Sequence, residues 1–121
     1  MKKTKIRTNN RPVIISKADI AKAIRDVFST HCFVQNAEKS KEFRGSAIEY
    51  WERATGINID HWKCPHCNKN YKRQDLDGAH VVLWGQQGGP QWITPVCKQF
   101  NEKKDYQTPF LVHKNCLVEA P

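Results

Sequence analysis

The chain has 121 residues, of which 39% are hydrophobic and 26% charged, and its formal net charge at pH 7 is +8. This length predicts one domain with a modest hydrophobic core. No apolar run approaches the roughly 18 residues that a membrane-spanning helix needs, which excludes a function within the membrane.

The N-terminal residues and the cysteines predict a cytoplasmic protein. Met1-Lys2-Lys3-Thr4-Lys5 is followed by no apolar stretch, so no secretory signal is expected. Five cysteines, an odd number, then indicate reduced thiols. In that compartment a Cys-x-x-Cys pair is typical of a metal site or a redox pair. The βαβ context that a redox pair needs is not recognisable in this sequence.

Basic residues are concentrated at the N-terminus. Residues 1–11 carry +5 of the formal charge and no acidic residue, which leaves +3 for the rest of the chain. Residues 1–12 are therefore predicted to form a flexible basic arm, suited to phosphate backbones or another anionic partner. The alternative is a solvated tail that only keeps the protein soluble. The basic residues of the arm are Lys2, Lys3, Lys5, Arg7 and Arg11.

Residues 13–56 are predicted to be mainly helical. Ser16 and Asp19 have the spacing of a capping box, which predicts a first helix over about residues 17–29. A second helix is expected over about residues 38–54, ended by Gly56. The positions expected to be buried recur at helical spacing. They are Ile20, Ile24, Val27 and Phe28 in the first helix and Phe43, Ala47, Tyr50, Trp51 and Ala54 in the second.

The segment from residue 57 onward alternates short strands with turns. Two strands over residues 79–84 and 91–96 flank a glycine-rich loop and are predicted to form a hairpin. A short helix follows over residues 98–104, with Cys97, Asn101 and Lys104 on one face. Residues 110–112 and 117–118 are predicted to be strands of a C-terminal hairpin.

Cys64-Pro65-His66-Cys67 has the form of a loop that binds a tetrahedral metal ion. Twelve residues separate Cys67 from His80, and sixteen separate His80 from Cys97. These spacings predict one structural zinc ion bound by Cys64, Cys67, Cys97 and His80. The alternative is that Cys97 packs as a small apolar residue and His80 is a hydrogen-bonded strand histidine.

One stretch resembles a known family. The Cys-x-x-Cys pair, the strings Gly78-Ala79-His80-Val81 and Ile93-Thr94-Pro95-Val96-Cys97, and a helix with asparagine and lysine resemble the HNH endonuclease motif of small bacterial and phage proteins. The resemblance covers about residues 64–104. It implies a ββα-metal unit held on a treble-clef zinc frame.

The resemblance also implies roles for individual residues. Cys64, Cys67 and Cys97 match cysteines of the zinc frame. His80 matches the general base that polarises water in active members. Asn101 matches the last metal-binding residue of the motif.

Two positions depart from the motif. Phe100 replaces the second cysteine of the later pair, so the frame lacks its usual fourth ligand. Trp92 replaces the asparagine that orients the general base. His80 is the best candidate for the missing ligand, but a metal-bound imidazole nitrogen would no longer accept a proton. The other candidates are His66, His113 and Cys116.

Three functions agree with these observations. The first is nucleic-acid binding by a zinc-stabilised, HNH-like protein without efficient catalysis, with DNA and RNA not distinguished. The second is a metal-dependent endonuclease in which His80 and Asn101, with Asp77, lie at a magnesium or manganese ion. The third is a phage or mobile-element protein that binds and inhibits a host protein. In the first case the phosphate-facing residues beyond the arm are Lys69, Lys72, Arg73, Lys98, Lys103 and Lys104.

The predicted fold class is α+β. Two N-terminal helices are expected to pack on a zinc-bound ββα module of the HNH-like treble-clef type, which carries a short C-terminal β-hairpin. The predicted organisation is the flexible arm followed by a single domain over residues 13–121, helical over 13–56 and zinc-binding over 57–121.

Overall fold

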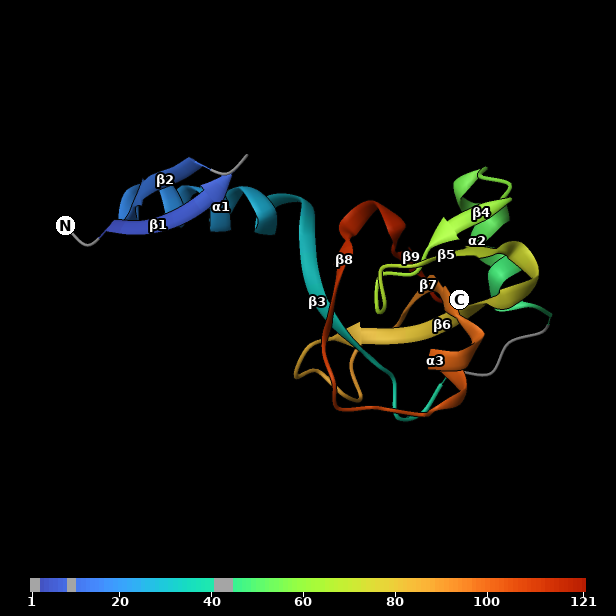
Figure 1. The fold of residues 1–121 in the computed structure, drawn as a ribbon. Helices are drawn as coiled ribbons and strands as arrows, with labels where there is room; N and C mark the ends of the chain where they lie inside the picture. The colour runs from blue at the N-terminus through green and yellow to red at the C-terminus, as the bar shows by residue number, and fades with distance from the viewer. Residues whose placement is uncertain (1–2, 9–10, 41–44) are drawn as a thin grey trace. The chain divides into compact units, whose positions relative to one another are not determined.

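The computed structural model describes residues 3–8, 11–40 and 45–121 of the chain (Figure 1). Its fold is mixed α+β, as predicted, with three α-helices among the described residues. The sequence suggests one domain from residue 13 onward, whereas contacts within the chain divide it into two compact units, Met1–His31 and Cys32–Pro121.

The N-terminal unit contains a β-hairpin where the sequence suggests a flexible arm. Strands β1 (Lys3–Thr8) and β2 (Arg11–Ser16) are antiparallel, with Lys3 opposite Ser16 and Thr8 opposite Arg11. The expectation of an unstructured arm is therefore corrected for these residues. Alternating β-branched residues such as Thr4, Ile6 and Thr8 favour a strand. The prediction of a flexible arm considered only the charged residues and so missed this preference.

Helix α1 (Lys17–Thr30) begins at the predicted cap. The Asp19 N–H donates to Ser16 Oγ at 3.2 Å, and the Ser16 N–H donates back to the Asp19 carboxylate at 3.4 Å. The predicted burial of its apolar residues is wrong, because no residue of α1 is buried. A unit of about thirty residues has too little chain to cover every helix face. The exposed fractions of these apolar residues are 36% for Ile20, 51% for Ile24, 42% for Val27 and 44% for Phe28.

The C-terminal unit is built on a five-stranded sheet with the order β8-β3-β6-β7-β9. The central pair β6 (Leu76–Leu83) and β7 (Trp92–Cys97) is the predicted hairpin, in antiparallel register with His80 opposite Ile93. Strand β3 (His31–Asn36) pairs with the other side of β6.

The predicted C-terminal hairpin is wrong. Strands β8 (Phe110–His113) and β9 (Val118–Glu119) lie at opposite edges of the sheet, separated in sequence by a 3-10 turn, Lys114–Cys116. Two such short strands gain more from pairing with the edges of an existing sheet than from pairing with each other.

Helix α2 (Ala47–Thr55) packs on β6 and β7. It begins at the Ser46 cap rather than at residue 38, and Phe43 lies outside the described residues. Gly56 ends it in the left-handed conformation, with φ 73°, as predicted. A Cβ added at Gly78 of β6 would lie 2.6 Å from the Ala47 carbonyl carbon, so glycine allows this close approach.

Trp51 is the central buried side chain under α2. It is fully buried, meets Trp62 edge to face at 5.1 Å between ring centroids, and donates its indole N–H to the Cys116 carbonyl at 2.8 Å. Its aromatic ring therefore belongs to the core, as predicted. Ile48 is the other buried residue of α2, whereas Ala54, for which the sequence predicts burial, is exposed.

Two hydrophobic clusters lie on opposite faces of the β6–β7 pair. The α2 cluster joins Ile48 and Trp51 to Leu76 of β6 and Ile93 of β7. The cysteine cluster lies on the other face and contains Cys64, Ala79, Val81, Val96, Cys97 and Phe100. Its other walls are a short hairpin of β4 (His61–Lys63) and β5 (Asn70–Lys72), the helix α3 (Lys98–Glu102), and the strands β3 and β8, which contribute Val34, Phe110 and Val112.

Candidate metal centre and the adjoining pocket

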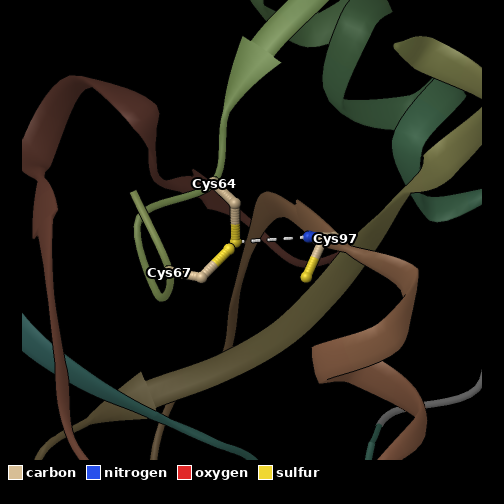
Figure 2. A group of neighbouring side chains, drawn as sticks. All are labelled: Cys64, Cys67 and Cys97. Atoms are coloured by element: carbon tan, nitrogen blue, oxygen red, sulfur yellow. Dashed lines mark hydrogen bonds between the residues drawn. The ribbon is translucent and has the colours of Figure 1, made fainter. Parts of the chain in front are cut away.

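Three cysteines converge in the structure, as the sequence predicts. The sulfur atoms of Cys64, Cys67 and Cys97 all lie within 4.8 Å of one another. Figure 2 shows Cys64 and Cys67 in the loop that follows β4, facing Cys97 at the end of β7. Three thiolates at this separation could hold a metal ion.

The loop between β4 and β5 is shaped by its own backbone. The Cys64 N–H donates to the Lys69 carbonyl at 2.9 Å, and the Asn68 N–H donates to the Cys64 carbonyl at 2.8 Å. Asn68 closes the turn with a left-handed φ of 59°, which asparagine tolerates better than most residues. These bonds hold Cys64 and Cys67 on the same side of the loop.

Backbone N–H groups point at two of the sulfur atoms. The Cys97 N–H donates to Cys64 Sγ at 3.3 Å, drawn as the dashed line in Figure 2, and the Phe100 N–H donates to Cys97 Sγ at 3.4 Å. Such bonds stabilise thiolates. Burial nevertheless raises the pKa of Cys64 to about 11, so a metal ion must displace its proton.

Tyr71 of β5 is a member of this site that the sequence analysis missed. Its hydroxyl oxygen lies 3.2 Å from Cys67 Sγ. Hydrogen bonding to Cys67 and then to Cys97 raises the pKa of Tyr71. Burial acts to raise the pKa of Cys67, but the hydrogen bond from Tyr71 and others from its neighbours outweigh burial, so this pKa is lowered. The position of Tyr71, four residues after Cys67 on the returning strand, is the only sequence signal for this contact.

The structure does not bring His80 to the three cysteines. Ala79 and Val81, its neighbours on β6, pack in the cysteine cluster, so strand alternation turns His80 to the opposite face. Its cross-strand partner Ile93 belongs to the α2 cluster on that face. His80 therefore does not lie where a fourth ligand is needed.

His80 and Asn101, the predicted catalytic pair, instead share a pocket of about 200 Å³. Burial lowers the pKa of His80, so its imidazole is neutral near pH 7. The Asn101 side-chain amide donates to the Asp77 carboxylate at 3.2 Å. The pocket is lined by Asn36, Ala37, Ser40, Gly78, His80, Asn101, Lys104 and Tyr106.

The other candidates for the fourth ligand have different contacts. The ring of His66 stacks on Phe100, with 3.6 Å between centroids and 11° between planes. His113 Nδ1 accepts from the Asn115 N–H at 3.1 Å. Cys116 is half-buried, and burial raises the pKa of its thiol. In the described part of the chain, none of these three residues places a donor atom beside the sulfur atoms of Cys64, Cys67 and Cys97.

The predicted phosphate-binding residues differ in their availability. Arg73 is held by Glu52 of α2, to which its Nε and Nη2 donate at 3.0 and 2.9 Å. Lys2 lies outside the described residues, and Lys3, Lys5, Arg7 and Arg11 lie on the β1–β2 hairpin. The exposed members in the C-terminal unit are Lys69, Lys72, Lys98, Lys103 and Lys104.

Comparisons of the chain with models of protein families, with curated proteins and with solved structures found no match. In the part of the chain that the structure describes, no helix has the length and apolar character needed to cross a membrane.

Proposed function

We propose that the chain is a zinc-stabilised, HNH-like nucleic-acid-binding protein without efficient catalysis. Zinc is the metal proposed for Cys64, Cys67 and Cys97, because thiolate-rich tetrahedral sites favour it. The order of the elements supports an HNH-like frame: a cysteine loop on the β4–β5 hairpin, then the β6–β7 hairpin, then helix α3. When bound, the zinc would fix these three elements against one another.

The observation that carries the proposal is the composition of the pocket beside His80. The side-chain amide of Asn101, the hydroxyl of Ser40 and the exposed cation Lys104 line one concave site. Hydrogen-bond donors combined with a cation suit a phosphodiester group better than an apolar ligand.

Substitution of one lysine tests the assignment of the pocket. Lys104→Gln is expected to weaken binding of short single-stranded and duplex oligonucleotides and to reduce the slope of log K against log salt by about 0.7–0.9. Lys63→Gln is the matched control, because Lys63 is exposed on β4 and does not line the pocket. Fluorescence anisotropy at several salt concentrations measures both values. Equal effects of the two substitutions would assign binding to another surface.

A second candidate function is metal-dependent cleavage of the bound nucleic acid. It is favoured by the position of His80 on the sheet face opposite the cysteines, where the imidazole is not a ligand of the zinc and would serve as a general base. Asn101 and Asp77, which are hydrogen-bonded to each other, would hold a magnesium or manganese ion, which would supply Lewis-acid chemistry to the phosphate. The neutral His80 side chain would accept the proton of the attacking water.

A further inference from the structure

Three cysteines leave one position of a tetrahedral metal ion without a ligand. Structural zinc sites are almost always four-coordinate. Across residues 3–8, 11–40 and 45–121, no histidine, aspartate, glutamate or further cysteine places a donor atom with the three sulfurs. A fourth protein donor from those residues would therefore be of another type.

The hydroxyl oxygen of Tyr71 lies at about the distance from a cysteine sulfur that two ligands of one zinc ion would have. Zinc lies about 2.3 Å from sulfur and about 2.0 Å from oxygen ligands, which puts tetrahedral sulfur and oxygen donors roughly 3.5 Å apart. Tyr71 Oη lies 3.2 Å from Cys67 Sγ, close to that spacing.

The strand that carries Tyr71 fixes the direction of this side chain. Tyr71 is the middle residue of β5 and pairs with Trp62 of β4. Its half-buried ring packs against both hydrophobic clusters. The same hairpin thus carries Cys64, Cys67 and Tyr71, and it places the tyrosine oxygen beside Cys67 Sγ.

We propose that Tyr71 is the fourth zinc ligand and binds through its phenolate oxygen. Its proton passes to solvent when the metal binds, as do the thiol protons of the cysteines. Three thiolates and one phenolate around Zn²⁺ carry the same net charge as the four-cysteine sites that proteins commonly use. The inference rests on the proposed zinc at the three cysteines and is independent of nucleic-acid binding.

Titration of zinc into the metal-free, full-length protein tests the proposal by ultraviolet difference spectroscopy. The wild type is expected to gain one tyrosinate band for each zinc bound. Tyr71→Phe is expected to gain none and to bind zinc at least about tenfold more weakly. Tyr50→Phe is the matched control, because the Tyr50 hydroxyl donates to the Glu119 carbonyl at 3.1 Å. This control is expected to behave as the wild type.

Cobalt substitution of the wild type gives a second measurement that needs no variant. If Tyr71 fills the fourth position, added imidazole leaves the visible bands of the cobalt protein unchanged. Zinc binding without a tyrosinate band, or a shift of the cobalt bands with imidazole, would overturn the proposal and leave Tyr71 as a hydrogen-bond donor to Cys67. A wild type that binds neither metal would overturn the zinc centre as well, which separates the two failures.

Discussion

His80 combines a neutral imidazole with a position opposite the cysteines. Burial lowers its pKa, which favours the form that accepts a proton near pH 7. A productive base must also be oriented, and Trp92 does not serve this purpose. Trp92 lies opposite Val81 and packs against the cysteine cluster, on the other face of the sheet from His80.

We therefore expect weak or absent cleavage of plasmid DNA with magnesium or manganese. General-base catalysis is worth about 10²–10⁴ in rate, and part of this is lost because Trp92 cannot take over the orienting role of the asparagine that it replaces in the motif. The comparison is the wild type with His80→Ala, and His61→Ala is the control because His61 is exposed and does not line the pocket. Efficient cutting by the wild type and the control, but not by a folded His80→Ala protein, would establish the endonuclease function instead.

Substitution tests whether the three converging cysteines, unlike Cys32 and Cys116, bind the metal ion. Cys64→Ser is expected to lower the melting temperature sharply and to abolish zinc binding at one equivalent. The reason is that structural zinc supplies about 10–16 kcal/mol of apparent binding free energy at neutral pH, much of it as folding. Cys32→Ser is the control, since Cys32 is half-buried on β3 and is not one of the three converging cysteines. Native mass spectrometry and thermal unfolding measure the two effects, and a stable metal-free wild type would contradict the zinc assignment.

At the scale of elements, an ion pair connects α2 to the end of the β4–β5 hairpin. Glu52 accepts from Arg73 at 2.9 and 3.0 Å and from the Ile59 N–H at 2.9 Å. The Glu52 and Arg73 side chains are 16% and 35% exposed, so solvent screens the pair only in part. The hydrogen bond from Arg73, followed by that from Ile59, lowers the pKa of Glu52.

Glu52→Gln is expected to reduce the free energy of unfolding at pH 7 by about 1 kcal/mol. A lowered folded-state pKa means that the stabilisation is complete above the ordinary value of 4.5 and is lost as the pH falls through the folded value. The difference from the wild type should therefore vanish in acid. Urea unfolding at several pH values measures it. Glu102→Gln, at an exposed position of α3, is the control. Acid would affect metal binding equally in both variants, so only the loss of the Glu52 interactions distinguishes them.

Local signals predict some elements, and non-local contacts decide the others. The Ser16 and Asp19 cap and the Gly56 stop act within a few residues, so the sequence reveals them. The pairing of β8 and β9 depends on sheet edges formed by distant strands, which no local pattern reports. The same reasoning applies to His80. Its spacing from the cysteines suggests a metal ligand, but Ala79 and Val81 are buried on the cysteine face of the sheet, so His80 lies on the opposite face.

At the scale of the whole molecule, the charge is divided between the two units. The hairpin of the N-terminal unit lies in the part of the chain that carries +5 of the net +8. The exposed lysines of α3 and its end lie in the C-terminal unit, beside the pocket that contains His80. The proposed binding of nucleic acid would therefore draw on either unit, and the two contributions would be separable by salt dependence.

Neutralising the N-terminal charges is a better test than deletion, because deletion would remove β1 from its hairpin. A variant with Lys2, Lys3, Lys5, Arg7 and Arg11 replaced by glutamine is expected to bind duplex DNA more weakly. Its slope of log K against log salt should be flatter by about 0.9 for each phosphate that the variant no longer neutralises. The matched variant replaces Lys98, Lys103 and Lys104. An unchanged slope in the first variant and a flatter slope in the second would restrict binding to the C-terminal unit and leave the N-terminal charges a role in solubility only.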